Sequence, residues 1–367
     1  METKMTMNTA DHTPFFVGAY AAAPSLSGWD PGAEGRFLAS VLALDGVAGL
    51  EVPFTGKLHK DDEAWFLRQL PEQARFVVTT IPGTMARLQA DKSFGLASTS
   101  APGRRSALDF VKAALDAVKR LNQQLGRPAV VALELHAAPV AVKDAATAAA
   151  LEASLIELSD WDTAGARLAL EHCDALMPNQ TPAKGFLALE AEAEAVQRAN
   201  DATGNPMGMV INWGRSVIEQ RRPEAAREHI AYLRDRGLLG GLVFSGCAGV
   251  DTRFGEAWAD VHVPPVPANA ARSGGSNGTG NGTGVELLEP ASLLTADRIK
   301  ECLQAAGTLP ETGFHAIKVA APRGATVDQR VAVISQTLAA MQQQRPSSGG
   351  NANEQKRVGS QQRPVQT

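Results

Sequence analysis

Cysteine is scarce in this chain of 367 residues, and its three cysteines, Cys173, Cys247 and Cys302, are widely spaced. An odd number of cysteines without a Cys-x-x-Cys pair is typical of free thiols in a reducing compartment rather than of a disulfide framework. The first residues, METKMTMNTADHTP, lack the apolar core of a secretion signal. We therefore expect a cytoplasmic protein.

Long apolar runs and blocks of basic residues are also missing. No run approaches the ~18 apolar residues that span a bilayer. The net charge is −4 and the pI is about 6.0, so neither nucleic acid nor an anionic membrane surface is an expected partner. No glycine-rich turn follows the first expected strand, where the chain reads GAYAAAPS. That absence disfavours a doubly wound nucleotide-binding sheet, and we expect no nucleotide cofactor.

What the sequence does contain is an alternation of short apolar runs with amphipathic stretches, which predicts βαβ units and a parallel sheet. The expected strands lie at about 15–22, 46–54, 75–83, 128–136, 167–173, 207–212, 240–245 and 314–321. The expected helices lie at about 31–44, 61–70, 105–125, 143–158, 188–200, 222–236, 295–306 and 326–342, with a loop at 85–104. Eight such units in the α/β class predict a single-domain (β/α)8 TIM barrel over residues 14–343.

Three segments have compositions that cannot build a packed core. Residues 1–13 form a polar lead-in, 268–286 are rich in Gly, Ser and Asn, and 344–367 are of low complexity. We predict that all three are disordered, the second as a flexible insertion before the last helix and strand.

Ionisable residues gather where the expected strands end, which is where barrels of this kind place their chemistry. Side chains two apart on a strand share a face, so Glu134 and His136 are expected to point into one site, and Glu171 into the same site from the next strand. These three residues could form an acid/base pair or hold a metal, or they could be structural ion pairs at the rim. His172 and Asp174 could contact substrate, or lie outside the barrel and support the groups that do.

Further candidates follow later strands. Asn212, Trp213 and Arg215 in NWGRS are expected to contact a ligand, although Asn and Gly also favour turns. Ser245 lies in FSGCAG, a loop that could bind an anion or form a tight turn. Lys318 lies in an apolar strand, where it either carries out chemistry or points outward.

Two candidates come from the start of the chain. Glu51 is a further carboxylate at a strand end, and the ring of Tyr20 could stack on a sugar.

The motifs VGAYAAAP…WDP, GLEVPFTG…LH, IPGT…FGLAS, ELHAAP, EHCDA, PAKGF, NWGRS, FSG and EPASLLT resemble an uncharacterised family of barrels. That family is grouped with the xylose-isomerase-like sugar isomerases and epimerases. The resemblance covers about residues 15–340 and implies a divalent metal, such as Mn, Mg, Zn or Co, with proton transfer between sugar carbons. Glu171 matches a metal ligand of the wider superfamily, but Asn212, Ser245 and Lys318 stand where further ligands are expected. Either the metal has moved toward Glu134, His136 and Glu171, or Lys318 supplies the positive charge instead.

The sequence therefore supports three hypotheses. The first is a sugar, sugar-acid or sugar-phosphate isomerase or epimerase, with Glu171, Glu134, Lys318 and His136 as catalytic residues. The substrate-binding candidates are Glu51, His172, Asp174, Asn212, Trp213, Arg215, Ser245 and Tyr20. The second is a lyase or hydrolase of a keto-sugar or polyol, and the third is a carbohydrate-binding barrel without catalysis. A homodimer is a further expectation, by analogy with similar barrels.

Overall fold

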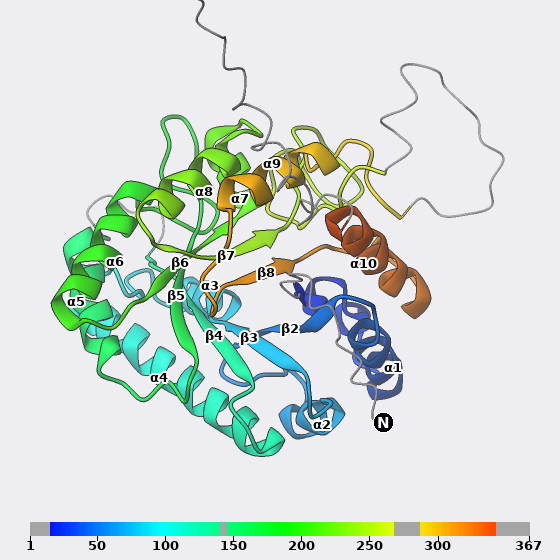
Figure 1. Ribbon diagram of the computed structural model, residues 1–367, viewed down its shortest axis with the longest axis horizontal. Helices are drawn as coiled ribbons and strands as arrows, with labels where there is room; N and C mark the ends of the chain where they lie inside the picture. The colour runs from blue at the N-terminus through cyan, green and yellow to red at the C-terminus, as the bar shows by residue number, and fades with distance from the viewer. Residues whose placement is uncertain (1–14, 140–144, 268–286, 343–367) are drawn as a thin grey trace, which may run out of the picture.

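The computed structural model describes residues 15–139, 145–267 and 287–342. Within them, parallel strands pair in chain order from β1 to β8, and β8 pairs with β1 to close a barrel (Figure 1). The strands are β1 (Phe15–Val17), β2 (Val47–Pro53), β3 (Arg75–Thr79), β4 (Val130–Leu135), β5 (Arg167–His172), β6 (Gly208–Asn212), β7 (Leu239–Phe244) and β8 (Phe314–Ile317). The predicted (β/α)8 barrel is confirmed, while the three segments predicted to be disordered lie outside the described residues.

Helices surround the barrel (Figure 1). They are α1 (Pro31–Leu42), α2 (Glu63–Gln69), α3 (Ile81–Ala90), α4 (Ala101–Leu125), α5 (Ala148–Ser159), α6 (Leu189–Thr203), α7 (Trp213–Gln220), α8 (Ala225–Asp235), α9 (Ala296–Ala306) and α10 (Val327–Gln342). Two 3-10 turns, η1 (Ala19–Ala22) and η2 (Pro24–Ser27), follow β1. Helix α1 begins as its sequence predicts, because the Asp30 side chain accepts hydrogen bonds from the Gly32 and Ala33 amides. No helix in these ranges is long and apolar enough to cross a membrane.

The sequence prediction was wrong at two helices. Residues 81–90, expected as the end of a strand and part of a loop, form α3, which starts with Pro82 in its first turn. Residues 213–220, expected as a loop after NWG, form α7, whose residues from Trp213 to Glu219 are all buried. Helix α7 has only eight residues and starts directly after β6, beside the turn-forming residues Asn212 and Gly214, so its sequence indicates a turn instead of a helix.

The inside of the barrel is built in layers. A small apolar cluster fills its centre, and includes Val77, Ala132, Ala169, Val210, Val243 and Ala316. Side chains two residues further along each strand point the same way. These next residues are Thr79, Glu134, Glu171, Asn212, Ser245 and Lys318, and all of them are buried. The apolar cluster is therefore the floor of a polar layer at the C-terminal ends of the strands, here called the barrel mouth.

Candidate active site

The barrel mouth carries three buried carboxyl groups from different strands. Glu51 lies on β2, Glu134 on β4 and Glu171 on β5, and each side chain is almost fully excluded from solvent. Asn212 on β6 and Lys318 just after β8 complete this group, and both are also buried. Burial of a carboxyl group is costly unless a partner or a bound ligand compensates it, so the contacts of each group decide its role.

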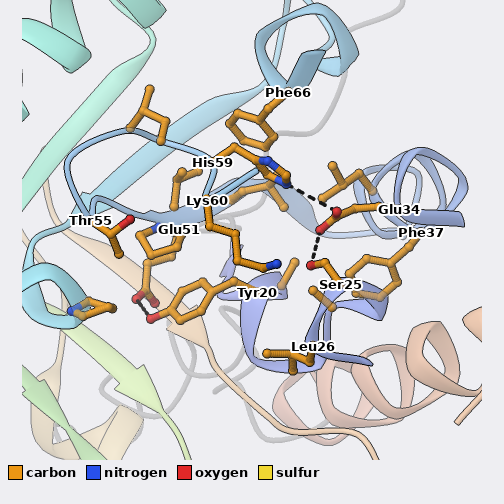
Figure 2. Close-up of a pocket in the computed structure, with 18 residues that line it drawn as sticks. Tyr20, Ser25, Leu26, Glu34, Phe37, Glu51, Thr55, His59, Lys60 and Phe66 are labelled. Carbon is orange, nitrogen blue, oxygen red and sulfur yellow. Dashed lines mark hydrogen bonds and ion pairs between the residues drawn. The ribbon is translucent and has the colours of Figure 1, made fainter. Parts of the chain in front are cut away.

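Lys318 is the cationic partner of Glu51. Its Nζ lies 2.5 Å from Oε1 of Glu51. The Tyr20 hydroxyl donates to the same oxygen at 2.9 Å, and Figure 2 shows this second contact. Burial alone would lower the pKa of Lys318, but Glu51 and Tyr20 raise it well above its usual value. A Cβ on Gly18 would lie only 3.0 Å from Cγ of Lys318, so the glycine leaves room for this side chain. Lys318 is therefore a fixed positive charge at the barrel mouth.

Arg215 and Asn212 orient Glu171. Both donate to Oε1 of Glu171, Asn212 from Nδ2 at 3.1 Å and Arg215 from Nη1. Arg215 Nη1 also lies 3.1 Å from Sγ of Cys173, and its Nε donates to Oδ2 of Asp260 at 3.1 Å. Oδ2 of Asp260 also accepts a hydrogen bond from Nζ of Lys184 at 2.5 Å. Asp260 therefore holds Arg215, the residue that orients Glu171, in place.

Glu134 differs from the other two carboxyl groups because it lacks a cationic partner. Neither of its oxygens has a hydrogen-bond partner of ordinary geometry among the described residues. Burial raises its pKa well above the usual value, Glu51 and Glu171 raise it further, and Lys318 and the Thr79 hydroxyl oppose this more weakly. Its surroundings therefore favour the neutral, protonated form of Glu134.

His136 lies beyond Glu134 on the same face. Its Nδ1 accepts a hydrogen bond from the Ala138 amide at 2.9 Å, and burial lowers its pKa to about 3. The ring is therefore neutral, and its proton lies on Nε2. This makes His136 a hydrogen-bond donor rather than a charge.

The remaining substrate-binding candidates have structural contacts. Ser245 Oγ lies 2.7 Å from Nδ1 of His262 at the edge of the barrel mouth, and Trp213 is buried in the core. Asp174 accepts from the amides of Lys184 at 2.9 Å and Gly185 at 3.1 Å, and so shapes the loop that presents Lys184. Lys184 lies in the PAKGF motif but has no distinguishing chemical pattern there, and Asp260 and His262 follow the seventh strand at an unspecific spacing.

His172 points away from the barrel mouth into a separate cluster behind β5, here called the outer cluster: His172, Glu192, Glu219 and His229. His172 Nδ1 lies 2.7 Å from Oε2 of Glu192, and its Nε2 lies 2.9 Å from Oε2 of Glu219. Burial would lower the pKa of His172, but the two carboxylates raise it to about 10.

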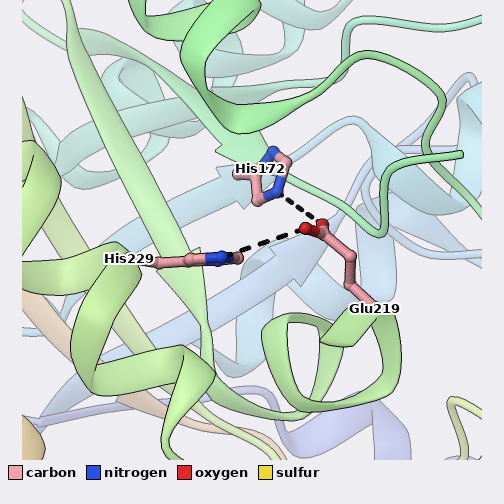
Figure 3. A group of neighbouring side chains, drawn as sticks. All are labelled: His172, Glu219 and His229. Atoms are coloured by element: carbon pink, nitrogen blue, oxygen red, sulfur yellow. Dashed lines mark hydrogen bonds and ion pairs between the residues drawn. The ribbon is translucent and has the colours of Figure 1, made fainter. Parts of the chain in front are cut away.

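The outer cluster could bind a metal ion. His172, Glu219 and His229 offer ligand atoms that all lie within 4.8 Å of one another (Figure 3). Glu192 on Nδ1 of His172, and the Ser216 hydroxyl 3.0 Å from Nδ1 of His229, occupy the positions of groups that orient metal-bound imidazoles. A metal would have to displace the proton on Nε2 of His172, so the site competes with protonation.

The barrel mouth fits a metal less well. No set of three His, Cys, Asp or Glu groups there brings its ligand atoms within 4.8 Å, as far as the described residues extend. Lys318 and Arg215 also already neutralise Glu51 and Glu171. The structure therefore does not bring Glu134, His136 and Glu171 together as a compact metal site.

A closed barrel of eight parallel strands with ionisable groups at its mouth places the chain in the class of (β/α)8 TIM barrels. The chain belongs to the family described as a domain of unknown function, DUF4862, whose pattern matches residues 16–333. It is 32% identical over 329 residues to an uncharacterized protein of Salmonella typhimurium, covering 88% of this chain and 95% of that protein.

Solved structures share the fold at low sequence identity. One is a candidate xylose isomerase from Rhodospirillum rubrum, with a TM-score of 0.54, 13% identity, and coverage of 92% of this chain and 100% of that chain. Another is a xylose isomerase-like TIM barrel/4-hydroxyphenylpyruvate dioxygenase fusion protein, with a TM-score of 0.52 and 12% identity. That match covers 92% of this chain but only 44% of the fusion protein.

Proposed function

We propose that this protein is an isomerase or epimerase of a small sugar or sugar acid, which acts by proton transfer next to a carbonyl carbon. The observation that carries the proposal is a set of buried, unpartnered acceptor atoms at the barrel mouth. Oε2 of Glu51, Oε2 of Glu171 and Oδ1 of Asn212 have no hydrogen-bond donor among the described residues. Unpaired buried acceptors are costly, and a ligand rich in hydroxyl groups supplies the donors that they lack.

The charges at the barrel mouth favour a neutral sugar over a phosphorylated one. Lys318, Arg215 and Lys184 each have a carboxylate partner already, at Glu51, Glu171 and Asp260. A phosphate group would have to compete with these carboxylates for its cations, whereas hydroxyl groups add to the existing network.

The carboxyl groups of Glu171 and Glu134 have complementary surroundings. Glu171 is held at Oε1 by Arg215 and Asn212, which leaves Oε2 to remove a proton from carbon. Glu134, whose raised pKa favours the protonated form, would return a proton to the neighbouring atom. Lys318 would stabilise negative charge on the enolate oxygen, and His136 would donate a hydrogen bond from Nε2. Because this arrangement supplies an acid, a base and a cation, no step is assigned to a metal.

Incubation in deuterium oxide with neutral aldoses, ketoses and sugar acids tests the proposal, with NMR detection of deuterium on carbon. We expect exchange at one carbon next to the carbonyl, and a loss of exchange in Glu171→Gln. A sugar that binds without exchange in the wild-type protein would contradict the proposal and support a carbohydrate-binding barrel instead.

A lyase or hydrolase of a keto-sugar is the second candidate, and the raised pKa of Glu134 specifically favours it. A protonated carboxyl group can protonate a departing oxygen, which elimination requires and epimerisation does not. Release of a second product, detected in the same NMR spectra, would distinguish this reaction from isomerisation.

A further inference from the structure

A second hollow adjoins the barrel mouth on the side of β1 and β2. It is a cavity of about 230 Å³ between β2 and the helices α1 and α2, and its walls are mostly apolar (Figure 2). Phe37, Leu38, Leu58 and Phe66 line it.

Two residues belong to both the cavity and the barrel mouth. Tyr20 and Glu51 line the cavity, and the same two side chains hydrogen-bond to each other beside Lys318. A ligand held by Glu51 at the barrel mouth therefore lies next to an apolar space.

Apart from Glu51, the charged side chains in the cavity already have partners, and Nζ of Lys60 lies 2.6 Å from Oδ2 of Asp61. Glu34 accepts from the Ser25 hydroxyl at 2.8 Å, and its Oε2 lies 3.3 Å from Nε2 of His59 (Figure 2). Nδ1 of His59 accepts from the Asp62 amide at 3.0 Å, which leaves the ring proton on Nε2, facing Glu34. Ser25, Glu34 and His59 therefore satisfy one another's hydrogen bonds, so no charged ligand is needed to compensate them.

The cavity has room for a six-membered ring. An engineered apolar cavity of roughly 150 Å³ is large enough to bind benzene, and this one measures about 230 Å³. Leu26 is 65% exposed and also lines the cavity, so an apolar edge faces solvent where a ligand would enter. Exposed large apolar residues that border a cavity are typical of binding sites.

We propose that this cavity is a subsite for an aromatic substituent of the substrate, whose sugar part lies against Glu51 and Lys318. The inference rests on the proposed function and narrows its substrate class to aryl-substituted sugars or sugar acids. Burial of a ring against the apolar walls would add about tenfold to hundredfold in affinity.

Binding of 4-fluorophenol, followed by ¹⁹F NMR, tests the cavity apart from any sugar. We expect saturable binding that is weakened at least tenfold in Leu38→Trp, which fills the space. Leu303→Trp is the matched control, because Leu303 lies on α9 and is as buried as Leu38, at 7% exposure. Absence of binding to the wild-type protein, or equal binding by both variants, would overturn the subsite.

A milder pair keeps the test valid if the tryptophan variants do not fold. Leu26→Ala should weaken 4-fluorophenol binding several-fold, whereas Val250→Ala, which shortens another exposed apolar residue, should leave it unchanged. Equal affinities in this pair would count against the proposed entry edge and against the subsite.

Pairs of phenyl and methyl glycosides of glucose, galactose and xylose then test the link to the barrel mouth. At least one phenyl glycoside should bind about tenfold more tightly than its methyl counterpart. Leu38→Trp should abolish this difference and leave the affinity for the methyl glycoside unchanged. Equal affinities within every pair would overturn the joined site. Failure of all six to bind, while 4-fluorophenol binds, would overturn the joined site but not the cavity; the carbohydrate function is tested separately by deuterium exchange, because these glycosides have no free carbonyl group.

Discussion

Glu171 and His172 are neighbours on β5, but their side chains lie on opposite faces of the strand and differ in their hydrogen-bond partners. Glu171 points into the barrel mouth and keeps one oxygen without a partner, whereas His172 points outward and has a carboxylate on each ring nitrogen. Both side chains are buried to the same degree. Burial alone therefore does not distinguish these two residues, but the presence or absence of an unpaired atom does. The following predictions test this contrast, from the largest expected effect to the smallest.

Replacement on the inward face should abolish chemistry. Glu171→Gln keeps the shape and a hydrogen bond to Arg215 but removes the base, so deuterium exchange should fall by about 10²–10⁴-fold. Glu190→Gln, which changes an exposed glutamate on α6, is the matched control. Exchange that survives Glu171→Gln at the wild-type rate would assign the base to another residue.

Replacement on the outward face should affect stability instead. Glu192→Gln removes one of the two carboxylates that hold His172, and loss of a hydrogen bond between charged groups costs about 1.5–3 kcal/mol in the free energy of unfolding. Exchange per folded molecule should change only a few-fold. Urea unfolding measures the first effect, and a large loss of activity in the folded variant would show that the two faces are coupled.

The outer cluster should also make stability fall at alkaline pH. The pKa of His172 is raised to about 10 in the folded protein, from about 6.5 in an unfolded chain. Its contribution is therefore complete below pH 6.5 and is lost as the pH rises through about 10. Unfolding free energies at pH 7, 8.5 and 10 should decline, and His172→Gln should flatten this decline. An equally steep decline in the variant would assign it to other groups.

Zinc should have the smallest effect, and a pH-dependent one. Because zinc competes with the proton on His172, its stabilisation should increase from pH 6 to pH 8.5. The gain would be about 2.7 kcal/mol when free zinc is 100-fold above Kd. His229→Ala should abolish it, whereas Glu171→Gln should not. Metal lost from the purified protein in Glu171→Gln, but retained in His229→Ala, would place the ion at the barrel mouth instead.

The inward residues could be predicted because they follow a local rule. A period of two along each strand places Glu134, Glu171, Asn212 and Lys318 over the apolar floor of the barrel. The same rule pairs Glu171 with Cys173, and both contact Arg215.

The partners of these residues could not be predicted from the same rule. Glu192 and Glu219 come from helices, and Lys184 and Asp260 from loops, so their approach depends on packing and not on spacing. The buried α7 was missed for a different reason: its eight residues start directly after β6, where Asn212 and Gly214 indicate a turn.

The pairing of Lys318 with Glu51 has a consequence for biosynthesis. Glu51 emerges early from the ribosome, but its cation follows β8, the last strand to be made. Until that strand inserts beside β1, the barrel stays open and Glu51 has no ammonium partner. A nascent or truncated chain therefore cannot assemble the charge balance of the barrel mouth until the two ends of the barrel meet.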